Sequence, residues 1–224
     1  MNTIWYTYPA WIIVAGLLGF AISFVFAGLL RLPRRIFLVP HILFSGLFLY
    51  AFFRWSGIPL QEMIKHNWIW GLIGAALLAV FLVKNVYSQP ASLRTKGVTF
   101  AFDILWLGVL YGLIDALLLS VLPVFATWQA FTLLGWTTSW PGKILVGLVA
   151  ILASFLVTAA YHLGYPEYKG KGLMGPVIGN TTMTLGYLLT TNPLAAMLSH
   201  IAMHTAGVFH GPASVTQLPP HYQS

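Results

Sequence analysis

Seven apolar stretches constrain this chain more than any other feature of its sequence. A helix needs roughly 20 apolar residues to cross a hydrocarbon core about 30 Å thick. Six stretches are close to that length, at residues 10–31, 35–54, 67–88, 143–162, 172–190 and 193–210. The seventh is longer and runs from Gly97 to about Phe125. The sequence therefore predicts an all-α, polytopic transmembrane bundle of about seven helices.

The long stretch needs its own explanation. At about 1.5 Å per residue it exceeds what a bilayer requires, so we expect it to tilt, to break or to begin along the surface. Gly108 and Gly112 are the candidate break points. The connection at 126–142 contains Trp128, Trp136 and Trp140, which favours an interfacial or re-entrant segment at the outer membrane face.

The composition excludes several classes of protein. Only 7% of the 224 residues are charged, whereas about 25% is typical of soluble domains. The net charge is +7, but no basic run is longer than Arg34-Arg35, so we expect no nucleic-acid partner. There is no cysteine, which excludes disulfides, thiolate catalysis, iron–sulfur clusters and covalently attached c-type haem. The N-terminal residues lack the basic region of a signal peptide, so the first apolar stretch is expected to be a retained helix.

The distribution of cations predicts an orientation. With the N-terminus outside, eight cations lie on the cytoplasmic side and three lie outside, which satisfies the positive-inside rule. We therefore expect an integral protein of a prokaryotic inner (plasma) membrane, in contact with lipid. Residues 1–96 form a three-helix segment in this scheme, 97–210 a four-helix core and 211–224 a frayed polar tail. The cytoplasmic set is Arg31, Arg34, Arg35, Lys84, Arg94, Lys96, Lys169 and Lys171.

Ionisable side chains at membrane depth are costly and are candidates for function. His200 and His204 are spaced i, i+4 in the last stretch, so both imidazoles face one side of a helix and could bind one metal ion. The alternative is that both hydrogen-bond neighbouring helices. His41 and Ser45 have the same spacing, and there we expect structural hydrogen bonds. Close packing is expected for the segment 172–190, because small residues recur along it at Gly172, Gly175, Gly179 and Gly186.

Two aspartates and one further histidine could complete a site. Asp115 has no basic residue within a helical turn, so it needs a partner, a metal or water. Asp103 lies nearer the cytoplasmic end and could pair with Lys96. His162 lies at the end of the segment 143–162. Depth along the helices leaves open which aspartate meets the histidines.

Three motifs in the C-terminal half resemble those of a known family. LVTAAYHLGYP ends one helix, LLTTNPLAAMLSHIAMH opens and fills the last one, and GLIDALLLSVLP lies in the long stretch. Residues 97–210 are thus similar to the membrane core of the CPBP family, the CAAX-processing and bacteriocin-processing intramembrane proteases. The family motifs are EExxxR, FxxxH and HxxxN. Asp115 stands in the first glutamate position, His162 in that of the second motif and His200 in that of the last.

The resemblance implies a site of Asp115, His162, His200 and His204 that hydrolyses a peptide bond. Thr158 replaces the usual Phe, and His204 replaces the usual Asn. Ala116 and Ser120 stand where the second Glu and the Arg belong, so two groups that glutamic-type catalysis uses are missing. One aspartate with three histidines is instead a chemically sensible zinc set.

Other functions stay open at this stage. SHIAMH, with His41, Ser45 and Asp103 upstream, resembles the CREST superfamily of seven-helix zinc amide hydrolases. A non-catalytic CPBP-like protein could bind a protein or lipid partner in the same cavity. A b-type haem or quinone protein is a further alternative, because imidazoles on different helices can ligate haem.

Overall fold

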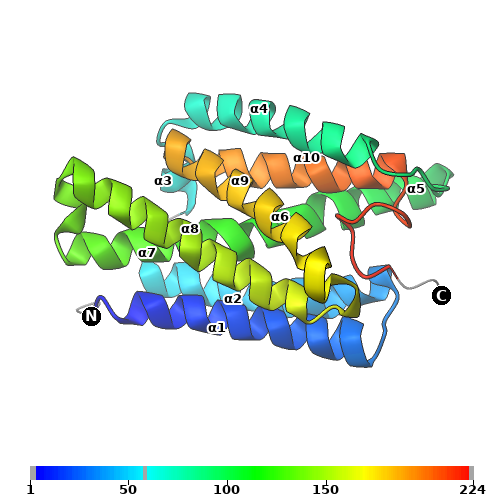
Figure 1. Ribbon diagram of the computed structural model, residues 1–224, viewed down its shortest axis with the longest axis horizontal. Coiled ribbons are helices and arrows are strands. Elements are labelled where there is room, and N and C mark those ends of the chain that lie inside the picture. Colours follow the sequence, from blue (N-terminus) through cyan, green and yellow to red (C-terminus); the bar gives the residue numbers. More distant parts are fainter. Residues whose placement is uncertain (1–3, 58–59, 222–224) are drawn as a thin grey trace.

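The computed structural model describes residues 4–57 and 60–221, and that part of the chain contains helices and no strand. The long helices lie roughly parallel to one axis and form an elongated bundle (Figure 1). The described chain begins at one end of this bundle, and its C-terminal segment lies at the other (Figure 1). This arrangement agrees with the all-helical bundle that the sequence predicts.

Six of the predicted stretches correspond to helices with similar bounds. The first two are connected by a short loop, and the first ends in a π-helical stretch, Ser23–Leu29. A short helix α3, Leu60–Lys65, was not predicted. The six are α1 (Thr7–Ile22), α2 (Arg34–Ser56), α4 (Trp68–Tyr87), α8 (Trp140–Leu163), α9 (Met174–Thr190) and α10 (Leu194–His210).

The seventh stretch is one helix of 37 residues, Gly97–Leu133. It joins α5 (Gly97–Asp103), α6 (Tyr111–Ala116) and α7 (Leu122–Leu133) through the π-helical stretches Ile104–Leu110 and Leu117–Val121. The prediction that residues 126–142 form an interfacial or re-entrant connection was therefore wrong. Helix α7 extends to Leu133, and only a short 3-10 turn, Trp136–Thr138, separates it from α8.

Gly108 and Gly112 do not break this helix, which corrects the second expectation for it. Both instead lie where α10 packs closely against it. A Cβ on Gly108 would stand 2.7 Å from Thr205 Oγ1, and a Cβ on Gly112 would stand 2.8 Å from the Cα of Ile201. Small residues allow such close approach of helix backbones in a membrane. The two glycines thus bring α6 and α10 together, and these helices carry Asp115 and His200.

The outer surface is apolar. Large side chains such as Leu77 and Val80 on α4 and Leu148 on α8 are more than half exposed. Five helices of the described chain are long and apolar enough to cross a membrane. A water-soluble protein would not expose so much apolar surface. The chain is therefore a helical integral membrane protein whose outer face contacts lipid.

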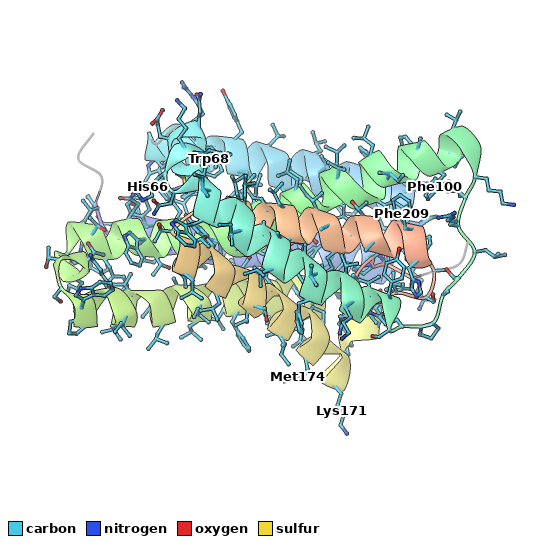
Figure 2. The ribbon with its side chains drawn as sticks, turned by 90° about the horizontal axis from the view of Figure 1, so that it is seen from above. His66, Trp68, Phe100, Lys171, Met174 and Phe209 are labelled. Atoms are coloured by element: carbon cyan, nitrogen blue, oxygen red, sulfur yellow. The ribbon has the colours of Figure 1, made fainter. Side chains whose placement is uncertain are left out.

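The two ends of the bundle differ in charge. Lys171 lies near the end that carries Phe100 and Phe209, and His66 and Trp68 lie near the other (Figure 2). Successive long helices run in opposite directions, so eight of the eleven lysines and arginines lie at the first of these ends. We call it the basic end.

Candidate functional site

A cavity of about 310 Å³ lies between α4, α6, α9 and α10. Its wall includes all four residues of the predicted site, Asp115, His162, His200 and His204. Helix α9 contributes a part of the wall without bulky side chains, because Gly175 and Gly179 have open space where a Cβ would be. Close packing was predicted for these two glycines, and it is absent there because they face the cavity.

Three of the four residues form a compact group. Asp115, His200 and His204 each offer a ligand atom, and these atoms lie within 4.8 Å of one another. His204 Nε2 lies 3.8 Å from Asp115 Oδ2, and the two imidazole centroids are 5.1 Å apart. All three side chains are buried. The i, i+4 spacing on α10 places both imidazoles on one helix face, as predicted, and Asp115 approaches that face from α6.

The donor set fits a divalent metal ion such as zinc. Zinc in catalytic sites is commonly held by two histidines and one carboxylate, with the fourth position left for water or substrate. The Nδ1 atoms of His200 and His204 are buried and have no hydrogen-bond partner among the described residues. Buried polar atoms are rarely left unpaired, because each costs its desolvation energy. A metal ion bound at Nδ1 of these rings would give those atoms the partner that they lack.

His41 supports the carboxylate of Asp115. Its Nε2 lies 3.0 Å from Asp115 Oδ1, and both side chains are buried. The imidazole packs face to face with Phe37 and Tyr161, at centroid distances of 5.7 and 5.3 Å. The sequence predicted a structural hydrogen bond for His41 without its partner. Hydrogen bonds of this kind orient metal-binding carboxylates.

His162 lies in the cavity wall but outside the compact group. Its Nδ1 donates a hydrogen bond to the carbonyl of Thr158 at 2.8 Å. A carbonyl accepts only, so Nδ1 carries the proton and Nε2 of the neutral ring keeps its lone pair. Of the predicted set of three histidines and Asp115, two histidines and Asp115 therefore form the compact group, and His162 lines the same cavity.

Asp103 does not join the histidines. Arg35 donates to both of its carboxylate oxygens, at 2.8 and 2.7 Å, and Thr95 donates a further hydrogen bond at 2.6 Å. The expected partner was Lys96, which the described contacts of Asp103 do not include. Arg35 is the second residue of α2 and was interpreted from the sequence only as an orientation signal. The aspartate that meets the histidines is Asp115.

Ala116 and Ser120, two of the residues that differ from the CPBP motifs, have structural roles. Ala116 is fully buried in the core. Ser120 Oγ donates to Asn180 Oδ1 at 2.8 Å, and Asn180 Nδ2 donates to Thr158 Oγ1 at 2.7 Å. The π-helical stretch around Leu119 also leaves a backbone carbonyl that accepts from Asn180 Nδ2. This network joins the long central helix to α8 and α9 beside the cavity.

The C-terminal tail is packed, which corrects the expectation that it is frayed. Val215 and Leu218 are fully buried, and Thr216, Gln217 and Pro219 line the cavity. Residues 222–224 lie outside the described part of the chain. The tail closes the side of the cavity that faces the basic end.

Comparison with known proteins gives no relative from which to transfer a function. No protein-family model, no curated protein and no solved structure matches this chain.

Proposed function

We propose that this protein is a membrane-embedded hydrolase with CPBP-like architecture, which cleaves a peptide bond with the aid of a metal ion. One observation carries the proposal. Asp115, His200 and His204 bring their ligand atoms within 4.8 Å of one another in the wall of a cavity, and His162 lines the same cavity. A metal-binding group beside a further imidazole is the arrangement that metal-assisted hydrolysis needs.

Asp115, His200 and His204 would hold the metal. A bound zinc ion supplies Lewis acidity and lowers the pKa of a coordinated water. His41 holds the Asp115 carboxylate in place by its hydrogen bond to Oδ1. The lone pair on His162 Nε2 can accept a proton from the attacking water and return it to the leaving amine. The two carboxylates of glutamic-type catalysis are not needed in this scheme, which suits the presence of Ala116.

The membrane placement completes the proposal. Helices α9 and α10 have 17 residues each, about 25 Å at 1.5 Å per residue. We count both as spans, which gives seven, with the basic end in the cytoplasm and the N-terminus outside. The host membrane is then the inner (plasma) membrane of a prokaryote. The cavity extends from the middle of the bilayer toward the cytoplasm, because Tyr168, Thr216 and Gln217 at the basic end also line it.

The competing proposal is a non-catalytic protein that binds a membrane protein or a lipid in the same cavity. The replacement of the motif's second Glu and Arg by Ala116 and Ser120 favours it. A haem protein is less consistent with the geometry. His200 and His204 lie on neighbouring turns of one helix with Asp115 beside them, which suits a small ion better than the two faces of a haem.

Metal analysis and a cleavage assay test these alternatives. Purified protein is analysed for zinc, and a panel of fluorogenic membrane-anchored peptides is offered to it in proteoliposomes. The controls are His200→Ala, Asp115→Asn and, as a matched exposed histidine, His66→Ala. We expect about one zinc per chain and cleavage that His200→Ala and Asp115→Asn abolish. Zinc without cleavage of any peptide supports the non-catalytic alternative. No zinc, with His200→Ala indistinguishable from the parent, refutes the metal site, and a Soret band in the purified sample supports haem.

A further inference from the structure

The C-terminal segment occupies the aqueous entrance of the cavity. After α10 ends at His210, residues 211–221 turn back across the basic end of the bundle (Figure 1). Thr216, Gln217 and Pro219 then form part of the cavity wall. A substrate that comes from the cytoplasmic side would meet this segment before it reached His200.

Two apolar anchors hold the segment on α10. Val215 and Leu218 are fully buried. Gly207 makes room for them, because a Cβ there would stand 2.9 Å from Leu218 Cδ1 and 3.1 Å from Val215 Cγ2. The segment is thus seated on a helix that also carries both metal-binding histidines.

Four side chains bind the main chain of the segment, and the first of them, the hydroxyl of Ser92, accepts from the backbone N–H of Ala213 at 3.1 Å. Gln89 Oε1 accepts from the backbone N–H of Thr216 at 2.9 Å. The hydroxyl of Tyr168 donates to the carbonyl of the same residue. The hydroxyl of Tyr111 donates to the carbonyl of Pro219 at 3.2 Å. Main-chain recognition of this kind is independent of side-chain identity and is how many grooves receive extended peptides.

Further polar contacts fix the segment from its sides. Gln217 Nε2 donates to Asn85 Oδ1 at 3.2 Å, and His221 Nδ1 pairs with Glu167 Oε1 at 2.8 Å. Tyr168 lies outside the spanning helices, and burial raises the pKa of its phenol, so it stays protonated and able to donate. The segment is therefore held at this end of the cavity by side-chain contacts as well as by its main chain.

We propose that residues 211–221 are an autoinhibitory cover that occupies the binding groove for an extended peptide substrate. Gln89, Tyr168 and Tyr111 bind the main chain of the cover, and they bind the main chain of a substrate in the same way after the cover leaves. The identification of the substrate as a peptide rests on the proposed function. The occlusion of the cavity by the cover does not.

The absence of cysteine from the natural chain makes a direct test possible. Met203→Cys places one thiol in the cavity wall, and a charged, membrane-impermeant maleimide reaches it in nanodiscs only from the aqueous side. Two of the hydrogen bonds to the main chain of the segment are then removed by combining Tyr168→Phe with Gln89→Ala. We call this protein the double anchor variant. Tyr50→Phe on the exposed face of α2 is the matched control, since its side chain is 66% exposed.

We expect the loss of two anchoring hydrogen bonds to raise the labelling rate by roughly tenfold or more. Tyr50→Phe should leave the rate unchanged, and melting temperatures of all variants should stay close together. A second protein keeps Met203 and carries Asn85→Cys together with Gln217→Cys. These two cysteines should form a disulfide on oxidation. Locking the cover this way should slow the exchange of bound zinc to an added chelator, and reduction should restore it.

Equal labelling rates in the parent and the double anchor variant would overturn the cover, as would equal rates of zinc exchange before and after the 85–217 pair is cross-linked. Neither readout requires hydrolysis or a known substrate. Loss of the proposed function would appear instead as absent zinc and absent cleavage in preparations where the labelling difference persists. A labelling difference, together with bound zinc and cleavage of the fluorogenic peptides by the parent protein, would support both.

Discussion

The hydrogen bond from His41 to Asp115 offers a sharp test of the metal centre, because His41 touches the ligand and not the ion. We consider His41→Phe. A phenyl ring keeps the packing of the imidazole against Phe37 and Tyr161. It removes the Nε2 donor 3.0 Å from Asp115 Oδ1 and nothing else that the described contacts include.

Two opposite effects act on the stability of the metal-free protein. Asp115 Oδ1 loses its buried donor, which costs about 1–3 kcal/mol. The substitution also removes His41 Nδ1, a buried atom with no partner among the described residues, and so recovers a cost of the same order. We therefore expect the unfolding free energy of the metal-free form to change by less than about 1.5 kcal/mol.

Metal affinity should respond much more strongly. Removal of a hydrogen bond that supports a metal ligand typically lowers affinity by about 10–100-fold. This range equals about 1.4–2.7 kcal/mol of binding free energy. His200→Ala, which removes a ligand itself, should lower the affinity further than His41→Phe does.

Competition for zinc with a chromophoric chelator in detergent measures the affinity, and thermal unfolding of the chelated protein measures stability. His66→Phe is the control, because His66 is an exposed histidine far from the cavity. Zinc affinity of His41→Phe equal to that of His66→Phe would refute the role of His41, provided that zinc binds the parent. A large loss of stability in the metal-free variant would show that removing the unpaired Nδ1 of His41 does not offset the lost hydrogen bond to Asp115.

Three further substitutions separate the site from the scaffold. Asp103→Asn should lower the melting temperature, because it removes the ion pair with Arg35, which is worth about 1–3 kcal/mol. It should leave the zinc affinity unchanged in the chelator competition. A weaker zinc complex would contradict the assignment of Asp115 as the ligand. Gly112→Ala should destabilise the protein by about 1–3 kcal/mol in thermal unfolding, since its Cβ would stand 2.8 Å from the backbone of α10. Gly46→Ala is the control and should leave the stability unchanged, because the space around Gly46 is open. Equal melting temperatures for the two glycine variants would show that α10 can move away freely. Asn180→Leu should cost about 1–2 kcal/mol, as expected for hydrogen bonds between membrane helices, and an unchanged melting temperature would mean that the polar network is dispensable.

The sequence was a good guide wherever the physics is periodic. Apolar length alone located six helices to within a few residues, because hydrocarbon thickness sets the length of each span. The i, i+4 spacing of His200 and His204 placed both imidazoles on one face, because helix geometry fixes that relation. The end of the long helix was misjudged, since Trp128 is equally compatible with an interfacial loop and with a helix that continues past the apolar run.

Contacts between distant segments were beyond reach of the same reasoning. Arg35 and Asp103 are separated by 68 residues, and His41 and Asp115 by 74, so no local pattern links either pair. Sequence depth left open which aspartate joins the histidines, because a helix of 37 residues is longer than the bilayer and its apolar length does not fix where it enters the membrane. The packed tail was missed for a related reason. Its composition is polar, and only two apolar side chains, Val215 and Leu218, pack against Gly207 on α10.

The π-helical stretch Ile104–Leu110 has a consequence for how related chains should be aligned. One residue more or fewer in an α-helix turns everything beyond it by about 100°. A π-helical turn is where such an extra residue is absorbed without ending the helix. This stretch separates Asp103, which faces Arg35, from Asp115, which faces His41. A homologue lacking one residue there would form a regular helix, and its two carboxylates would keep the same relative directions although one residue fewer separates them in the sequence. The gap in such an alignment belongs inside the helix, where alignment methods are least willing to place one.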